Sequence, residues 1–344
     1  MNKPLETATA PSTSLHIPAA YEKRLMVTAG RASKELGSRI AERLNVELID
    51  AGLKTFTDGE VYCRYEESIR GADIFIVQSI CGSEREGITP NDALMELLLM
   101  VHAAKHASAH RIIAVTPWYG YSRQDKKSAP REPISARLVA DLLEVAGIDR
   151  LVSMDLHAGQ LQGFFSKPVD HMTAMPILTQ YVQDRLGGQE LVIIAPDAGR
   201  VKLVRKFAQK VGAPYALMEK ERPAQQVAEI GYVIGDVKGK TAVIVDDIIG
   251  TGGTLSAAAQ TVLDEGAEKV YAVATHGLFS GNAFETLQES PLSGIVVTDT
   301  VPLREDAPGL ISQLTCADIL EDSIRRIFTD DSVSEIFAGE NQLF

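Results

Sequence analysis

Short apolar runs alternate with longer helical patterns along nearly the whole sequence, and this alternation limits the fold more than any other feature. The apolar runs are rich in Val and Ile and have no polar face, which is typical of parallel strands covered on both sides of a sheet. Chains that alternate strands and helices in this way build parallel sheets with helices as the crossover connections. We therefore expect an α/β fold of doubly wound parallel sheets.

At about 150 residues per domain, the length of 344 residues suggests two domains, and the alternation predicts two similar α/β units rather than one oversized sheet. We assign 23–175 to an N-terminal domain and 176–330 to a C-terminal domain, with 1–22 as a flexible extension and 331–344 packing back on the first domain. The expected strands span 24–29, 73–78, 111–117, 150–155, 191–196, 241–246, 269–275 and 294–299. The expected helices span 31–44, 91–106, 135–147, 174–186, 199–211, 252–265 and 282–289.

The composition excludes several classes of protein. The formal net charge is −12, whereas generic binding to a nucleic-acid backbone needs clustered cations, so we expect no nucleic-acid partner. Cys63, Cys81 and Cys316 fit neither a disulfide framework nor a zinc pattern, and indicate a reducing, cytoplasmic location. No apolar run approaches about 18 residues, and 1–20 lacks the apolar core of a signal peptide, so we expect no membrane span.

Oxygen-rich side chains stand where several of the expected strands end. Asp155 ends one strand and His157 follows it, Asp197 follows a second strand, and Asp246 and Asp247 stand at the end of a third. Ligands of parallel sheets collect beyond the carboxyl ends of the strands. These residues therefore favour a binding site at that edge.

Residues 235–241 look like a P-loop, but the pattern does not fit. Three residues separate Gly235 from Gly239, where the pattern needs four, and the segment precedes a strand instead of opening a helix. We interpret it as a turn that leads into the strand 241–246.

A second glycine-rich segment, 246–254, has the right surroundings, because it follows a strand and precedes a helix. Its glycines allow close backbone approach, and its N–H groups, the helix N-terminus and two threonine hydroxyls form a cup for phosphate. A plain turn with Thr254 as the helix N-cap is the alternative, but the two preceding carboxylates suit the hydroxyls of a sugar and favour a sugar-phosphate site. The expected residues are Asp246, Asp247, Thr251, Gly252, Gly253 and Thr254.

The segment 246–254 and the sequence on both sides of it resemble one family in particular, the ribose-phosphate pyrophosphokinases (phosphoribosyl pyrophosphate synthetases). The resemblance covers about 24–340 and includes separate motifs in the family's order. It implies two domains of the type I phosphoribosyltransferase fold. It also implies transfer of the β,γ-pyrophosphoryl group of ATP to the anomeric hydroxyl of ribose 5-phosphate, with release of AMP. The motifs lie at 56–60, 91–97, 121–127, 131–134, 155–160, 196–199, 220–222, 246–254 and 332–334.

The same resemblance implies where ATP binds. A loop with Arg123, Gln124 and Asp125 would contact ATP, and His157 would lie near it. The loop 56–60 would reach into the ATP site of a neighbouring subunit, so the chain is expected to self-associate in dimers that build a hexamer. In that loop Phe56 would stack on adenine, while Asp58 and Glu60 would accept hydrogen bonds from the base and its sugar.

The resemblance also implies a metal and a catalytic loop. His157 and Asp197 match positions associated with Mg²⁺, although histidine is an unusual magnesium ligand. Lys220 and Arg222 would close over the group in transfer and oppose its developing charge.

The sequence departs from the family pattern at a few positions. Gly250 stands where most members carry an aspartate, the connection 79–90 is several residues longer than usual, and Gly159 stands where some members carry a serine. In the family, the connection 79–90 lies in a region used for regulation by phosphate and ADP and for subunit packing. Residues that would serve an effector site are Arg131, Ser332 and Ser334.

Two other functions fit part of the sequence. A phosphoribosyltransferase would need the loop 246–254 but no ATP site, and the residues around Arg123 and Phe56 count against it. A non-catalytic regulatory homologue is supported by Gly250 alone, whereas the intact Lys220 and Arg222 count against it.

Overall fold

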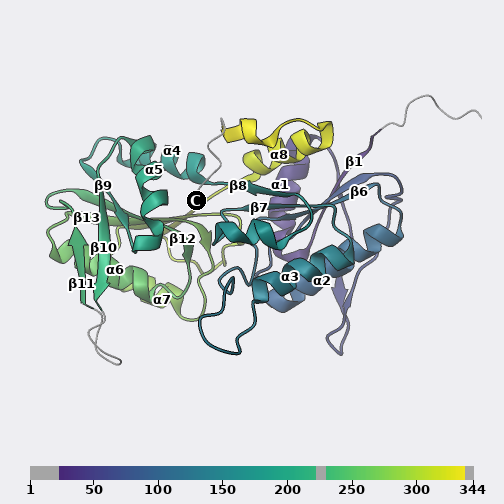
Figure 1. Cartoon of the computed structure of the whole chain (residues 1–344), viewed down its shortest axis with the longest axis horizontal. Helices are drawn as coiled ribbons and strands as arrows, with labels where there is room; N and C mark the ends of the chain where they lie inside the picture. The colour runs from purple at the N-terminus through teal and green to yellow at the C-terminus, as the bar shows by residue number, and fades with distance from the viewer. Residues whose placement is uncertain (1–22, 222–229, 338–344) are drawn as a thin grey trace, which may run out of the picture.

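Two sheets lie side by side in the computed structural model of the chain, which describes residues 23–221 and 230–337 (Figure 1). The first sheet has the order β2-β1-β5-β6-β7-β8 and is parallel throughout. Its strands are β1 (Leu25–Ala29), β2 (Leu48–Ile49), β5 (Asp73–Val77), β6 (Arg111–Thr116), β7 (Arg150–Met154) and β8 (Val169–Met172). A separate hairpin joins β3 (Lys54–Thr55) to β4 (Val61–Tyr62).

The second sheet has the order β11-β10-β9-β12-β13-β14-β15, and only β11 runs antiparallel to its neighbour. The expected α/β fold class, with two parallel-sheet units, is thus confirmed. The strands are β9 (Leu191–Ala195), β10 (Tyr215–Glu221), β11 (Ile230–Ile234), β12 (Thr241–Ile249), β13 (Lys269–Gly277), β14 (Gly294–Thr298) and β15 (Ile311–Leu314).

Helices cover both faces of each sheet. In Figure 1, α4 and α5 lie on one face of the second sheet and α6 and α7 on the other, while α2 and α3 cover the lower face of the first sheet. The helices are α1 (Lys34–Leu44), α2 (Pro90–His106), α3 (Ser135–Ala146), α4 (Met175–Leu186), α5 (Val201–Val211), α6 (Gly253–Asp264), α7 (Ala283–Gln288) and α8 (Ala317–Thr329). Short 3-10 turns are η1 (Arg31–Ser33), η2 (Gly159–Phe164), η3 (Ala198–Arg200) and η4 (Val333–Phe337).

Strand β5 shows why the apolar runs form central strands. All five of its residues are buried, and successive side chains point to opposite faces of the sheet. Phe75 and Val77 join the apolar core under α1, whereas Ile74 and Ile76 join the core under α2 and α3. A strand with two covered faces needs apolar residues at every position, which is the pattern in the sequence.

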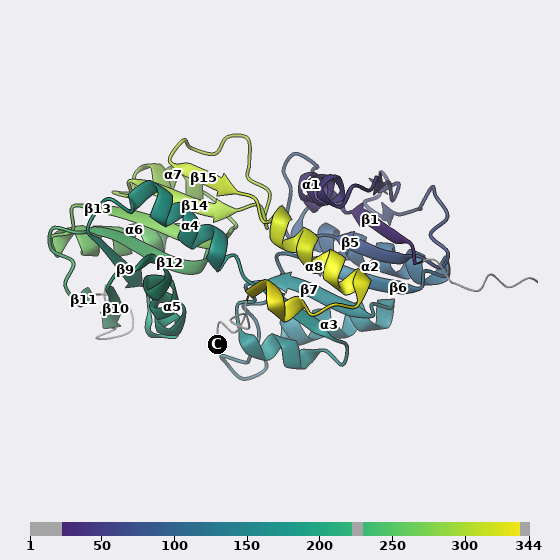
Figure 2. The ribbon, with the colours of Figure 1, turned by 90° about the horizontal axis from the view of Figure 1, so that it is seen from above.

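The two units share one apolar core. Helix α8 packs along α1, so the chain returns to the first unit after the last strand of the second (Figure 2). Ile40 of α1 and Ile324 of α8 belong to the same buried cluster as Ile193 and Val243 of the second sheet. This cluster therefore packs the first unit against the second.

Buried polar contacts also join the units. His276 in β13 is fully buried; its Nε2–H donates to the Met154 carbonyl at 3.1 Å, while its Nδ1 accepts from the Thr300 hydroxyl at 2.9 Å. Burial lowers the pKa of this histidine, in keeping with a neutral ring. The Ser79 hydroxyl also donates a hydrogen bond to the Thr300 carbonyl.

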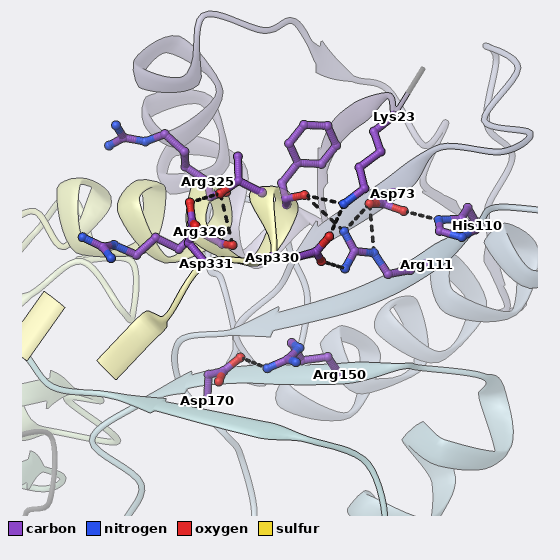
Figure 3. A network of polar contacts seen from close by, with 12 residues as sticks. Lys23, Asp73, His110, Arg111, Arg150, Asp170, Arg325, Arg326, Asp330 and Asp331 are labelled. Atoms are coloured by element: carbon purple, nitrogen blue, oxygen red, sulfur yellow. Dashed lines mark hydrogen bonds and ion pairs between the residues drawn. The ribbon is translucent and has the colours of Figure 1, made fainter. Parts of the chain in front are cut away.

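A network of charges fixes the end of α8 to the first unit (Figure 3). Asp330 caps the helix in the left-handed region, at φ 61°, and pairs with Lys23 and with Arg111 at 2.8 Å. Arg111 also pairs with the buried Asp73, whose second oxygen is bonded to His110. Burial raises the pKa of Asp73, but the bonds from Arg111 and His110 outweigh it and lower that pKa below its ordinary value.

The expected elements are found, with shifts at their ends. Helix α2 begins at Pro90, where the hydroxyl of Thr89 accepts from the Asp92 N–H and the Asp92 carboxylate accepts from Thr89. Residues 235–240 form the turn expected before β12. None of the helices within 23–221 and 230–337 is long and apolar enough to cross a membrane.

Candidate active site

The carboxyl ends of β7, β9 and β12 bring the expected strand-end residues to one edge. Strand β12 is longer than expected, because Ile248 and Ile249 continue the pairing with β13, so Asp246 and Asp247 lie inside the strand. Asp197 follows β9 and caps η3, where its side chain accepts from the Arg200 N–H at 3.2 Å.

A histidine of the first unit meets a carboxylate of the second at this edge. His157 Nδ1 lies 2.7 Å from Asp247 Oδ2. A carboxylate only accepts, so Nδ1 carries the proton, and Nε2 is the nitrogen that a neutral ring offers to other partners. Arg200 Nη2 lies 3.1 Å from the same Nδ1, but two donors cannot share a hydrogen bond, so this contact is one of proximity.

Arg200 was not predicted from the sequence, although it pairs with two carboxylates of the site. Its Nε lies 3.1 Å from Asp246 Oδ1 and its Nη2 lies 2.7 Å from Asp247 Oδ1. The guanidinium therefore binds both carboxylates expected to hold the sugar. The signal was in the sequence, because Arg200 directly follows the motif 196–199 at the end of a strand.

The two neighbouring carboxylates differ in their affinity for protons. Burial raises the pKa of Asp247, but the His157 hydrogen bond and the Arg200 charge outweigh it and lower that pKa to about 2. Burial, followed by the negative charge of Asp247, raises the pKa of Asp246 well above its ordinary value. The pKa values of two adjacent carboxyl groups move apart in this way because ionisation of one group opposes ionisation of the other.

The loop after β12 has the geometry expected for a phosphate cup. Gly252 adopts φ +80° and is the N-cap residue of α6, with no side chain capping the helix, so Thr254 is not the N-cap. A Cβ on Gly252 would lie 2.8 Å from Leu287, whereas Gly253 has open space around it. Uncapped N–H groups at the start of a helix favour an anion. Thr251, Gly253 and Thr254 are exposed at this helix start.

The loop between β6 and α3 approaches the phosphate cup from the first unit. A Cβ on Gly250 would lie 3.8 Å from Arg123 Nη1, the nearest atom found there. Gln124 accepts from the Ser135 hydroxyl, and the buried Asp125 accepts from Gln160. The expected ATP loop and the expected ribose-phosphate loop therefore meet at Arg123 and Gly250.

The loop 56–60 lies apart from these residues, at the tip of the β3–β4 hairpin. The Phe56 N–H donates to the Glu60 carbonyl at 2.8 Å, and Asp58 accepts from the Glu60 N–H at 3.1 Å. Phe56 is 44% exposed, although its ring contacts Tyr62 and the Lys54 ammonium. An exposed aromatic ring on a closed hairpin can contact another molecule.

The expected catalytic loop is described only at its start. Lys220 stands near the end of β10, where its backbone pairs with Gly231 of β11. Arg222 lies outside the described residues.

Three pockets of the described residues are lined by candidate site residues. A pocket of 370 Å³ lies behind Asp246 and Asp247, between α4 and α5, and Arg200 forms part of its wall. A cleft of 1590 Å³ separates the two units on the side of Arg123 and Gln124. The long connection 79–90 lines this cleft, and its Glu84 pairs with Arg304 of the second unit at 3.0 Å.

Part of the expected effector site lines the third pocket, which has a volume of 590 Å³. Ser332 and Ser334 line it together with Gly159, and the two serine hydroxyls lie 2.9 Å apart. Arg131 is not in its lining, and adopts φ 74° in an exposed loop. Arg150 and Asp170, which pair at 2.6 Å and are drawn in Figure 3, also line this pocket.

The donor atoms near His157 suit a metal that is bound largely through substrate. Within 23–221 and 230–337, no group of three or more His, Cys, Asp or Glu side chains could hold a metal ion. His157 offers Nε2, and the exposed Asp197 offers a carboxylate. Mg²⁺ commonly binds through one or two protein groups, waters and substrate phosphates, so the residues present fit such an ion.

Comparison with known proteins agrees with this arrangement. Residues 25–147 match the family described as the N-terminal domain of ribose phosphate pyrophosphokinase, and 191–338 match the phosphoribosyl synthetase-associated domain. The chain is 48% identical over 320 residues to a ribose-phosphate pyrophosphokinase of Caldanaerobacter subterraneus subsp. tengcongensis, covering 93% of this chain and 99% of that one.

Further relatives extend the match. The chain is 44% identical to a ribose-phosphate pyrophosphokinase of Clostridium perfringens, covering 92% of this chain and 98% of that one. The crystal structure of phosphoribosylpyrophosphate synthetase from Mycobacterium smegmatis superposes with a TM-score of 0.83 at 43% identity, covering 89% of this chain and 99% of that one. The chain belongs to the ribose-phosphate pyrophosphokinase family.

Proposed function

We propose that this chain transfers the pyrophosphoryl group of ATP to the anomeric hydroxyl of ribose 5-phosphate, giving 5-phosphoribosyl 1-pyrophosphate and AMP for nucleotide biosynthesis. The approach of Arg123 to Gly250 carries this proposal, because it brings the ATP loop of the first unit to the ribose-phosphate loop of the second. Pyrophosphoryl transfer needs two anionic substrates held in line and their charge neutralised, and this junction supplies both.

Ribose 5-phosphate binds to the second unit. Its phosphate lies in the cup formed by the N–H groups and hydroxyls of 251–254, at the uncapped start of α6. Asp246 and Asp247 accept hydrogen bonds from the ribose hydroxyls. The pair is suited to this because Asp247, with a pKa of about 2, is ionised at neutral pH.

ATP binds against the first unit. Arg123 contacts the polyphosphate, Gln124 and Asp125 complete the loop around it, and His157 lies beside it. The exposed hairpin with Phe56, Asp58 and Glu60 belongs to the ATP site of a second subunit. We therefore propose a dimer-based assembly, a hexamer in the complete enzyme.

The metal ion of this reaction is Mg²⁺, held by His157 Nε2 and Asp197. When bound, such an ion neutralises and orients the polyphosphate oxygens. The Asp247–His157 hydrogen bond fixes the imidazole ring so that Nε2 faces this position. Lys220 and Arg222 close over the transferring group and oppose its developing charge.

Regulation is proposed at the pocket of Ser332 and Ser334. Two hydroxyls 2.9 Å apart suit the oxygens of phosphate or the phosphates of ADP, with Arg131 as a further expected contact. A reducing, cytoplasmic location is supported by the free thiols, since Cys81 and Cys316 are buried and unpaired by disulfide. Burial raises the pKa of the Cys81 thiol to about 12, which makes it unreactive.

The test is an assay for AMP released from ATP, run with and without ribose 5-phosphate and Mg²⁺. We expect AMP only when both are present, and a lack of AMP under every metal and phosphate condition would refute the proposal. Lys220→Ala should lower kcat by about two orders of magnitude or more while sparing ATP affinity. Lys238→Ala, in the exposed turn 235–240, is the matched control and should leave kcat unchanged.

A further inference from the structure

Arg200 forms ion pairs with the two carboxylates that, in the proposed function, bind the ribose hydroxyls. Its guanidinium lies 3.1 Å from Asp246 and 2.7 Å from Asp247, through different nitrogens. One planar cation thus contacts both members of a pair of like charges. Such a pair, with Asp246 partly exposed and Asp247 buried, otherwise attracts a hard divalent cation, which takes oxygen ligands.

We propose that Arg200 is a built-in counter-ion for the Asp246–Asp247 pair and takes the place of a divalent cation there. Ribose 5-phosphate then binds to the pair without a metal ion between sugar and carboxylates, and the metal requirement is confined to ATP. This inference rests on the proposed function for the identity of the sugar. The contact between Arg200 and the pair does not depend on it.

The backbone holds Arg200 in this position. Arg200 ends η3, and its N–H is 3.2 Å from both the carbonyl and the Oδ1 of Asp197. Its side chain is only 18% exposed, so the guanidinium is packed in place before substrate arrives. A preorganised cation offsets the repulsion between the two carboxylates without recruiting an ion from solution.

The surroundings of the pair favour an anion over a second cation. Gly250 places no carboxylate in the loop, and Arg123 Nη1 is the nearest atom to the position where a side chain there would begin. Asp247 is already hydrogen-bonded to His157 through its other oxygen. Arg200 therefore brings to the two carboxylates the positive charge that a metal ion would otherwise supply.

Manganese binding tests the proposal without catalysis. Mn²⁺ is titrated into the full-length protein and the free ion is followed by electron paramagnetic resonance. We expect Arg200→Gln to gain one Mn²⁺ site per chain, about tenfold tighter than any site in the wild type. Arg200→Lys keeps the charge and should gain none. Arg205→Gln removes an exposed cation from the helix that follows, α5, and should also gain none.

The gained site must depend on the pair itself, so Asp247→Asn in the Arg200→Gln background should abolish it. If Arg200→Gln folds, as judged by circular dichroism, and binds no more Mn²⁺ than the wild type, the proposal is wrong. It is also wrong if Arg200→Lys gains the same site as Arg200→Gln.

A second measurement needs no variant. At saturating ATP–Mg²⁺, the KM of the wild type for ribose 5-phosphate should change by no more than about twofold over a tenfold range of free Mg²⁺. A KM that falls in proportion to free Mg²⁺ would contradict the inference while leaving the proposed function intact. Absence of any AMP formation would instead count against the proposed function, and the Mn²⁺ titration would still decide the role of Arg200.

Discussion

His157 Nδ1 lies 2.7 Å from Asp247 Oδ2, so a histidine that follows β7 of the first sheet shares a hydrogen bond with a carboxylate in β12 of the second. The bond crosses the junction between the two units and sets the ring orientation on one side and the carboxylate charge on the other. It therefore couples the region proposed for ATP to the region proposed for ribose 5-phosphate.

The two adjacent carboxylates should respond differently to neutralisation. Asp247 has a lowered pKa, so its charge stabilises the fold at neutral pH, whereas Asp246 has a raised pKa, so its charge does not. We expect Asp247→Asn to lower the free energy of unfolding at pH 7 by about 2 kcal/mol. Asp246→Asn should leave it equal or raise it, and both variants should raise the KM for ribose 5-phosphate. Urea unfolding measures the first effect, and equal losses in the two variants would contradict the assignment.

The same pKa of about 2 for Asp247 predicts an acid-dependent loss of stability. The stabilising contribution is complete above the ordinary carboxyl pKa, near 3.8, and is lost as the pH falls from there toward 2. The difference in unfolding free energy between the wild type and Asp247→Asn should therefore shrink over that interval. A difference that stays constant down to pH 2 would show that Asp247 is not held in its charged form.

Gly252 should not tolerate a side chain. At φ +80°, with Leu287 2.8 Å from the position of a Cβ, Gly252→Ala is expected to cost about 1–3 kcal/mol of stability. Gly253→Ala is the matched control, because nothing lies within 4 Å of its Cβ position, and it should cost much less. Thermal unfolding of both variants provides the measurement, and similar melting temperatures would count against the left-handed N-cap.

Gly250→Asp should fold normally but change ATP binding. The Cβ position has no neighbour closer than Arg123 Nη1 at 3.8 Å, so the new carboxylate fits and pairs with that guanidinium. Sharing Arg123 between a carboxylate and the polyphosphate should raise the KM for ATP by about three- to tenfold, the loss of roughly 1 kcal/mol of binding. Gly250→Asn has similar size without charge and should leave this KM near the wild-type value. Equal KM values in all three proteins would show that Arg123 does not contact ATP.

Asp73 belongs to the charged network of Figure 3. Replacing it should destabilise the segment 330–337, which the same network joins to the first unit. The Asp73 side chain is 2% exposed and pairs with Arg111, which also holds Asp330. Asp73→Asn is expected to destabilise the fold by about 2–4 kcal/mol, since Arg111 would lose a buried partner. Hydrogen exchange should rise in 330–337 more than in β12. Unchanged exchange in 330–337 would show that the network does not hold this segment.

The central strands were predictable because each is apolar on both faces and is bounded by polar residues, as β5 is. Several short peripheral strands were not expected, and β8 shows why: it has four residues, two partly exposed and then two buried, and such a pattern is too short to separate from a loop. Helix α8 was also missed, although Leu320, Ile324 and Ile327 stand at helical spacing and are buried in the structure.

The candidate residues could be identified by type and by their place at strand ends, but their partners could not. The sequence placed His157 and Asp247 on two separate strand ends, and only the packing of one unit against the other brings them together. Arg200 was overlooked for a related reason. A cation at a helix start usually faces solvent, and its two carboxylate partners lie in a strand that is distant in the sequence.

The apolar core shared by α1, α8, β9 and β12 limits how the enzyme can admit its substrates. Swinging the two units apart would divide this cluster, and each large apolar side chain that became exposed to water would cost roughly 1.5–3 kcal/mol. Opening the protein by a hinge between the two units is therefore energetically unfavourable. Entry, exit and any closure over the reacting groups therefore fall to the loops at the sheet edges, which can rearrange while the units that carry them stay still.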